Sequence, residues 1–200
     1  MSDSFLTALA KPQPDPGGGA AAAHGALIGL ALLEKIVVLE KAREKEQARS
    51  FQAWQKKEQA LTAMFLRMKY LREADRKIYP KLVKAKRSKA PLLTLNQVIT
   101  ESIAVPLEIM QEALKGFSLI AWVGTRCKKH LQGDVLVAGE LLMAVLYGAF
   151  HIGSSNLPLI KEIRQKRAIE KKLIEVLRKG EETWGRIKGD LSFERERGHS

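Results

Sequence analysis

A run of three glycines, Gly17–Gly19, is the first pattern in the sequence that could serve a chemical purpose. It follows Asp15 and Pro16 and leads into the alanine-rich stretch Ala20–Ala23. The run is not a phosphate-binding P-loop, because no Lys-Ser or Lys-Thr pair follows it. It is not a dinucleotide-binding fingerprint either, because no predicted strand leads into it. The glycine run by itself therefore assigns no cofactor.

The side chains that most often act as nucleophiles or metal ligands give weak signals. The single cysteine, Cys127, allows neither an intrachain disulfide nor a thiolate zinc site, and it favours a cytoplasmic protein. No activating base can be assigned to it, so a nucleophilic role is not predicted. The histidines are His24, His130, His151 and His199. They do not occur at metal-ligand spacing, so no metal site is predicted.

Length and composition are those of one globular domain. The chain has 200 residues, of which 46% are hydrophobic and 28% charged. Its net charge of +12 would attract polyanions, which leaves nucleic acid, an anionic small molecule and a merely solvated basic surface open. No recognised nucleic-acid module occurs, although the basic segment Lys81–Lys89 keeps that alternative open.

The first long helix is expected to begin at an Asp15-Pro16 cap and to reach about Leu39. Small residues recur on one face of it at Ala21, Gly25 and Gly29. Either a neighbouring helix crosses closely there or a ligand approaches the backbone, and close packing is favoured. The apolar run Gly17–Leu33 is short and weakly hydrophobic for a membrane span, so it is interpreted as a buried helix. Met1–Ala10 does not have the pattern of a signal peptide.

Helical periodicity continues over most of the remaining chain, and no strand pair is predicted. No Gly or Pro interrupts Lys35–Tyr79, which is expected to form one helix or two helices joined near Arg49–Ser50. The next helix is expected over Leu93–Leu131, bent or divided at Pro106. Two more are expected, one capped by Asp134 and reaching about His151, and one from Leu159 to about Lys179 after a cap at Asn156. Pro80 is expected to mark a break between helices, and Gly180 is expected to end the last helix. The predicted fold is an all-α, single-domain bundle of long antiparallel helices spanning 1–200, with its core within 5–180 and a flexible tail at 190–200.

Several segments together are more specific than any of these patterns. They are Pro16-Gly17-Gly18-Gly19, Asp75–Tyr79, Ala104–Glu108, Gly133-Asp134 followed by Tyr147–Ala149, and Asn156-Leu157. From about residue 5 to residue 165, their order and approximate spacing resemble the formimidoyltetrahydrofolate cyclodeaminase / methenyltetrahydrofolate cyclohydrolase family. The resemblance implies an all-helical homodimer that binds a tetrahydrofolate carrying a one-carbon unit and that needs no metal or redox cofactor.

The resemblance also implies an acid–base site. Opening or closing the methenyl ring requires proton transfers, for which a buried carboxylate is suited. Asp75 and Asp134 are the predicted catalytic carboxylates, although Asp134 could be an ordinary helix cap and Asp75 part of a helix-face ion pair. His130 could carry a proton in place of an asparagine of the family, or could be a solvated histidine.

Substrate-binding residues follow from the same resemblance. Gly17, Gly18 and Gly19 would expose backbone N–H groups at a helix start to oxygens of the ligand. Arg43 and Lys45 could meet the glutamate carboxylates of folate, or could simply form a solvated basic face. Tyr79, within one of the matching segments, is placed in the same group.

Other segments depart from the family pattern. They are Val38–Glu40, where the family has Asn-Leu-Thr, Ala42–Glu46, where it is lysine-rich, and Cys127–His130, where it has Gly-Asn-x-Asn. The function expected is that of a folate one-carbon enzyme, either cyclodeaminase or cyclohydrolase. The alternative is a catalytically degenerate member that binds folate or acts as a helical interaction protein. A cytoplasmic location is expected, and neither a membrane nor nucleic acid is expected as a partner.

Overall fold

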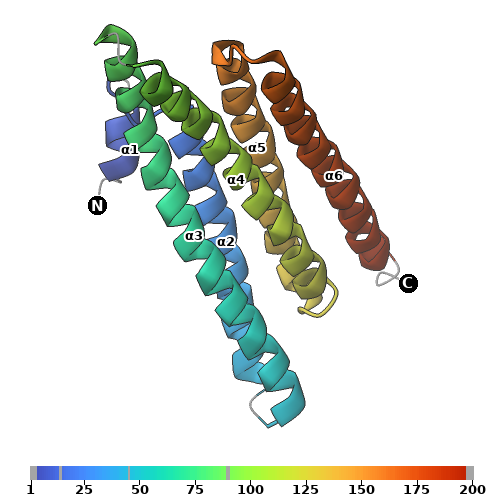
Figure 1. Ribbon diagram of the computed structural model, residues 1–200. Coiled ribbons are helices and arrows are strands. Elements are labelled where there is room, and N and C mark those ends of the chain that lie inside the picture. Colours follow the sequence, from blue (N-terminus) through green and yellow to red (C-terminus); the bar gives the residue numbers. More distant parts are fainter. Residues whose placement is uncertain (1–3, 14, 45, 89–90, 197–200) are drawn as a thin grey trace.

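The computed structural model describes residues 4–13, 15–44, 46–88 and 91–196. Within them the chain forms α-helices and two short 3-10 turns, and no strand. The elements are α1 (Ser4–Leu9), α2 (Gly18–Arg43), α3 (Ala48–Arg87), α4 (Leu92–Gly124), η1 (Lys129–Leu131), α5 (Gln132–Asn156), η2 (Leu157–Leu159) and α6 (Ile163–Glu196). The long helices run alternately up and down (Figure 1), so the prediction of an all-α antiparallel bundle is confirmed.

The core lies between α2, α3, α4 and α5, and α6 packs on α4 and α5. Large side chains buried there include Leu33, Met68, Phe117 and Leu142. Helices α2 and α5 approach closely through small residues. A Cβ placed on Gly29 would lie 3.2 Å from the backbone oxygen of Ala138, and one on Gly25 would lie 3.5 Å from Val145. At Gly25 and Gly29 the predicted stripe of small residues therefore serves helix packing.

The alternating directions gather distant parts of the sequence at the two ends of the bundle (Figure 1). One end holds the start of α2, the end of α3, the start of α4 and the end of α5, and we call it the glycine end because Gly17–Gly19 lie there. The other holds the end of α2, the start of α3 and the connection between α4 and α5. We call it the cysteine end, because Cys127 lies in that connection.

Prolines do not end the helices where the sequence predicted. Pro80 lies inside α3 and Pro106 inside α4, and both helices continue past them. A proline in a helix interior costs about 3 kcal/mol through the lost hydrogen bond and the ring clash. Packing offsets that cost at Pro80, because Ile78 and Leu82 on either side are buried in the core. The predicted break at Pro80 is therefore wrong, and Pro106 does not divide α4.

Predicted helix starts are also shifted. The N-cap of α2 is Gly17, two residues after Asp15. Helices α2 and α3 are separated between Arg43 and Ala48, a little before the joint expected near Arg49–Ser50. Helix α5 begins at Gln132 with no side-chain cap, so the alternative that Asp134 is its cap is wrong.

The last helix differs most from its prediction. Helix α6 begins only at Ile163, so Asn156 does not cap it, and it continues past Gly180 to Glu196. Gly180 lies against Leu146, where a Cβ would approach a methyl carbon to 2.7 Å, so this glycine makes room for packing and is not a helix stop. Leu191 is buried against Gly124, which extends the packed part of the chain beyond residue 190. Residues 197–200 of the predicted tail lie outside the described part.

Candidate active site

A cavity of about 190 Å³ opens at the glycine end. Helices α2, α3, α4 and α5 supply its walls, because all four have an end at this side of the bundle. It is lined by Asp15, Gly17, Gly18, Gly19, Asp75, Arg76, Ile78, Tyr79, Leu82, Ser102, Ile152, Ser155 and Asn156. The fold thus brings together five of the residues predicted from the sequence, namely the three glycines, Asp75 and Tyr79.

Asp75 of α3 lies directly against the first turn of α2. A Cβ on Gly19 would overlap the Asp75 carboxylate, so only glycine leaves room for this contact. No described glycine has a positive φ, and space therefore explains this glycine better than backbone conformation does. The backbone N–H of Ala20 donates a hydrogen bond to the carboxylate. Asp75 thus accepts an N–H group in the first turn of α2, next to the glycine N–H groups that were predicted to meet a ligand oxygen.

Asp75 has the electrostatic setting of a proton carrier. Burial raises the pKa of this carboxyl above its ordinary value of 3.8, while the hydrogen bond from Ala20 lowers it and the charge of nearby Asp15 raises it further. The adjacent cation, Arg76, bonds to Asp15 and Glu73. The alternative that Asp75 belongs to a helix-face ion pair therefore does not hold among the described residues. A raised pKa brings a carboxyl closer to the range in which it can both accept and return a proton.

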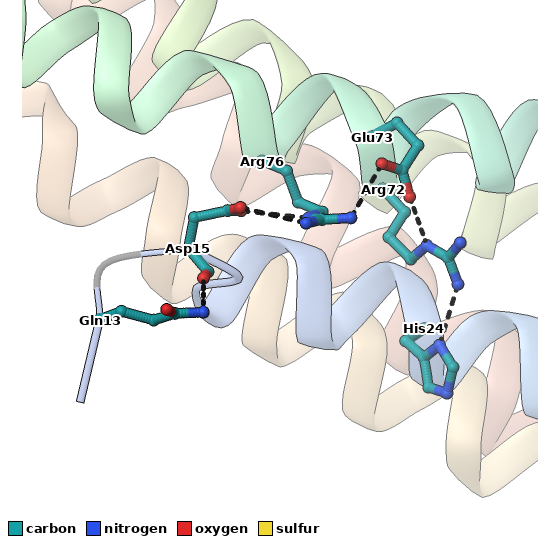
Figure 2. A network of polar contacts seen from close by, with 6 residues as sticks. All are labelled: Gln13, Asp15, His24, Arg72, Glu73 and Arg76. Carbon is teal, nitrogen blue, oxygen red and sulfur yellow. Dashed lines mark hydrogen bonds and ion pairs between the residues drawn. The ribbon is translucent and has the colours of Figure 1, made fainter. Parts of the chain in front are cut away.

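A chain of polar contacts fixes the loop before α2 onto α3 (Figure 2). Arg76 holds Asp15 through two bonds of 3.2 Å each, Nε to Oδ1 and Nη2 to Oδ2. Its third nitrogen, Nη1, donates to Glu73 at 3.1 Å. Glu73 also accepts from Arg72, whose Nη1 lies 3.2 Å from Nδ1 of His24. The bidentate contact with Asp15 holds the glycine run in place beside Asp75.

The polar cavity residues that were not predicted as site residues are Asp15, Arg76, Ser102, Ser155 and Asn156. The Asn156 side chain donates to the backbone oxygen of Ser102 at 3.0 Å, which joins the end of α5 to α4. The Ser102 hydroxyl is buried and donates to the backbone oxygen of Ile99 at 2.7 Å. Asn156 was within a segment that resembles the family but was interpreted as a helix cap. No local pattern in the sequence distinguished Ser102.

The other two predicted catalytic residues lie at the cysteine end. Asp134 forms an ion pair with Lys35 of α2, with Oδ2 and Nζ 3.0 Å apart. Lys35 is 16 residues beyond Gly19, which corresponds to about 24 Å along the helix axis. His130 is exposed in η1, beside the same end of α2. Within one chain, Asp134 and His130 therefore cannot act on the same small molecule as Asp75.

Arg43, one of the two predicted anion-binding residues, also lies far from the cavity. Arg43 is 24 residues beyond Gly19, or about 36 Å along α2. Its guanidinium bonds to Glu40, a buried residue that also accepts from the backbone N–H of Lys128 at 3.3 Å. Arg43 thus takes part in the contacts that join the end of α2 to the connection between α4 and α5. Lys45 lies outside the described residues.

Cys127 does not have the environment of a nucleophile. Its thiol is buried, and burial raises its pKa to about 11, with the charge of Glu40 acting in the same direction. A thiol with this pKa is almost wholly protonated at neutral pH. Among the described residues, no three His, Cys, Asp or Glu side chains lie together as a metal site would require. The prediction that no metal is used stays a prediction.

The long antiparallel helices, with a glycine-rich helix start beside a partly buried carboxylate, define an all-α class of bundle. A crystal structure of formiminotetrahydrofolate cyclodeaminase from Thermotoga maritima has the same fold, with a TM-score of 0.87, 21% sequence identity and 96% of each chain covered. The model of the formiminotransferase-cyclodeaminase family matches residues 1–175, and the chain belongs to that family. No curated protein matches the sequence. The resemblance to the cyclodeaminase family is thus confirmed.

Proposed function

We propose that the protein is an enzyme that forms or hydrolyses methenyltetrahydrofolate in the cavity at the glycine end. The observation that carries the proposal is Asp75, a partly buried carboxylate with a raised pKa in the wall of that cavity. Family membership supports a tetrahydrofolate derivative as the ligand. The cavity supplies the proton-carrying group that such a ligand would need.

Both reactions of the family require a proton carrier at the reacting carbon. In ring closure, N10 of the folate bonds to the carbon of the protonated formimidoyl group, whose C=N double bond becomes a single bond. N10 then loses a proton, the departing nitrogen gains one, and the remaining bond to that nitrogen breaks to release ammonia. In the hydrolytic reaction, water bonds to the methenyl carbon and loses a proton, one of the two nitrogens on that carbon gains a proton as its bond to the carbon breaks, and loss of the second water proton leaves a formyl group. In the proposed mechanism, Asp75 accepts the first proton and delivers the second.

The size of the cavity suggests how the substrate would lie. Sites for drug-sized ligands usually measure about 300–1,000 Å³, and this cavity holds about 190 Å³. It would therefore enclose only one end of a folate, and the reacting bicyclic end is the part that must reach Asp75. The remainder of the molecule would lie on the surface outside.

The test is to mix the purified protein with methenyltetrahydrofolate and to follow loss of its near-ultraviolet absorbance. We expect acceleration over buffer, and we expect Asp75→Asn to lose at least about 100-fold of it, the usual contribution of a general acid–base residue. Asp134→Asn is the matched control, because it removes a carboxylate from the opposite end, and it should retain activity. A parallel assay of ammonia release from formimidoyltetrahydrofolate distinguishes the two reactions.

Two results would reject the proposal. No acceleration in either assay would remove the enzymatic function. Activity that survives in Asp75→Asn but disappears in Asp134→Asn would move the chemistry to the cysteine end.

A second possibility, a folate-binding protein without catalysis, has one specific observation in its favour. The segments that depart from the family pattern, Val38–Glu40 and Cys127–His130, both lie at the cysteine end, where Glu40 contacts Lys128. If the family reaction also used the cysteine end, the polar groups that it needs there would be missing from this chain. Calorimetric binding of 5-formyltetrahydrofolate without turnover in either assay would favour this possibility.

A homodimer belongs to the same proposal and is supported by an exposed apolar face on α2 and α5. By length and composition, α2 and the segment Lys129–Leu159 could each cross a membrane, yet only 44% of the most apolar stretch of each is buried. The Lys35–Asp134 pair marks their shared outer face. Ile28, two turns from Lys35, and Val137, one turn from Asp134, lie on that face and are each 52% exposed. We call it the α2–α5 face.

A second copy of the chain fits the α2–α5 face better than lipid does. The face carries the Lys35–Asp134 ion pair, and charged groups in hydrocarbon are costly. At a protein–protein interface the same pair can remain hydrogen-bonded. A cytoplasmic location and the lack of a resident metal or redox cofactor complete the proposal.

A further inference from the structure

Large apolar side chains are exposed at the glycine end, where α4 and α6 begin (Figure 1). Leu92, Leu93 and Ile163 are 60%, 82% and 65% exposed, and Leu93 is the most exposed large apolar residue in the described part of the chain. A groove of about 470 Å³ lies between the two helix starts, lined by Leu92 and Leu93 from α4 and by Ile160 before α6. Neighbouring exposed apolar side chains of this kind often mark an interaction site.

Cations without carboxylate partners occur in the same region. Lys84 and Arg87 lie at the end of α3, only a few residues before Leu92, while Lys161 lines the groove and Arg164 lies in the first turn of α6. All four basic side chains are exposed, and no carboxylate of the described residues lies within ion-pair distance of any of them. The surface therefore combines exposed apolar groups with unbalanced positive charge. We call it the apolar–basic surface.

The acidic residues nearby do not cancel this charge. No acidic residue occurs between Asp75 and Glu101 in the sequence. Glu162 lines the groove, but its carboxylate accepts the backbone N–H groups of Arg164 and Gln165 at 2.8 and 2.6 Å. The partial positive charge of the α6 N-terminus thus offsets Glu162. Charge complementarity therefore favours an anionic occupant for the apolar–basic surface.

A bilayer that contains anionic lipids fits both features of the surface. Apolar side chains can enter the boundary between headgroups and acyl chains, while lysine and arginine stay at the level of the lipid phosphates. Nucleic acid would use the cations but would leave Leu92 and Leu93 in water, because its outer surface is a phosphate backbone. A second copy bound through the same surface would bring like charges together.

We propose that the glycine end binds the surface of an anionic membrane. The apolar side chains that would enter the headgroup boundary are Leu92, Leu93 and Ile163, and the cations that would meet lipid phosphates are Lys84, Arg87, Lys161 and Arg164. The sequence-based expectation of no membrane partner came from the lack of a convincing span, which a surface contact does not need. The anionic leaflet of a cell membrane is the cytoplasmic one, which agrees with the proposed location. The inference goes beyond the proposed function and does not depend on it.

The first experiment measures co-sedimentation of the protein with vesicles of phosphatidylcholine, and with vesicles of phosphatidylcholine and phosphatidylserine in equal parts. We expect binding to the anionic vesicles only, and a decrease as salt is raised. Lys161→Ala/Arg164→Ala should lower the partition coefficient by about 25-fold, or about fivefold for each cation removed. Lys179→Ala/Arg186→Ala removes the same two charges from exposed positions further along α6 and should leave binding nearly unchanged.

The second experiment tests the apolar part of the contact. Leu92→Ser/Leu93→Ser should weaken binding to the anionic vesicles by at least about tenfold. Ile174→Ser, at an exposed position about 16 Å along α6 from its start, is the control and should bind like the wild type. In Leu93→Trp, addition of anionic vesicles should move the tryptophan emission to shorter wavelengths, as the new ring leaves water. Urea unfolding of each variant checks that these exposed substitutions leave the fold intact.

Several outcomes would overturn the inference. They are no sedimentation with anionic vesicles at low salt, equal losses in the two double-alanine variants, and an emission of Leu93→Trp that vesicles do not change. Binding of a random DNA duplex that is lost in Lys161→Ala/Arg164→Ala but kept in Leu92→Ser/Leu93→Ser, without vesicle binding, would reassign the surface to nucleic acid. None of these measurements needs turnover, so vesicle binding would support the inference even if both activity assays failed.

Discussion

At the scale of single residues, the candidate site depends on the fit between Gly19 and Asp75. The carboxylate lies where a Cβ of residue 19 would be, and it accepts the N–H of Ala20 at the start of α2. This places a negative group at a helix N-terminus, which favours its charge, while burial opposes it. Burial has the larger effect, so the pKa is raised and the carboxyl is available for proton transfer.

The raised pKa of Asp75 has a measurable effect on stability. Because the folded state holds this proton more tightly than the unfolded state, the contribution of Asp75 to stability falls as pH rises from about 3.8 through the folded pKa. Asp75→Asn lacks this dependence, so its stability relative to wild type should increase from pH 3 to pH 7. Urea unfolding at a series of pH values measures the difference. If the wild type instead became more stable relative to the variant as pH rises, the folded state would favour the ionised carboxylate, which would contradict the raised pKa.

Replacing Gly19 by alanine should damage both stability and activity. The new Cβ would overlap the Asp75 carboxylate and push it from the wall of the cavity. We expect a loss of about 1–3 kcal/mol in the free energy of unfolding, as for other overpacked sites, together with most of the activity. Gly185→Ala in α6 is the control, because its Cβ would meet nothing within 4 Å, and it should be neutral or stabilising by up to about 1 kcal/mol. Equal effects of the two substitutions would contradict the packing argument.

At the scale of elements, α3 organises the site. Asp75, Arg76 and Tyr79 lie within little more than one turn of it, and Arg76 connects it to the loop before α2 through Asp15. The Asp15 charge also acts on Asp75, where it raises the pKa. The loop contact therefore serves two purposes, since it holds the glycine run in place and adjusts the proton affinity of the carboxyl.

Asp15→Asn should shift the pH dependence of activity. Without the negative charge of residue 15, and with Arg76 released from its partner, the pKa of Asp75 should fall. If the ionised carboxylate is the active form, the rising limb of the rate against pH would move to lower pH. Glu73→Gln removes the other acidic partner of Arg76 and should leave that limb in place. A shift to higher pH in Asp15→Asn would contradict the assignment.

At the scale of the whole molecule, the α2–α5 face decides the oligomeric state that we propose. Its apolar residues lie on α2 and α5, the two described helices that are long and apolar enough to cross a membrane and that are only partly buried in one chain. Covering them in a second copy would remove them from water, the usual driving force for association. The expected dimer follows from this surface and from the resemblance to the family.

Ile28→Glu should convert a dimer into a monomer. A charge in the centre of an apolar interface is strongly destabilising to the complex, whereas at an exposed position it should not affect the fold. Light scattering after size-exclusion chromatography measures the mass. Ile174→Glu on α6 places the same charge at a similarly exposed position and should leave the dimer intact. A monomeric wild type, or a dimer that survives Ile28→Glu, would reject the α2–α5 face as the interface.

The sequence determined the helical class, the close packing of a neighbouring helix on the small residues of α2, and the family. Each of these depends on residues near one another along the chain, through helical periodicity or short motifs. Helix ends were less well predicted, because Pro80 and Gly180 act as breakers only where packing does not compensate for them. Local sequence patterns therefore predicted which helices form better than they predicted where each helix begins and ends.

Only the tertiary structure separated the two predicted catalytic carboxylates. Asp75 and Asp134 both lie on helical segments that resemble the family, and their neighbours in sequence do not distinguish them. The up-and-down packing of α2, α3 and α5 brings Asp75 to Gly19, 56 residues away, and carries Asp134 to Lys35 at the other end. Contacts between residues so distant in the chain depend on how whole helices pack, and the same packing places Arg43 far from the cavity.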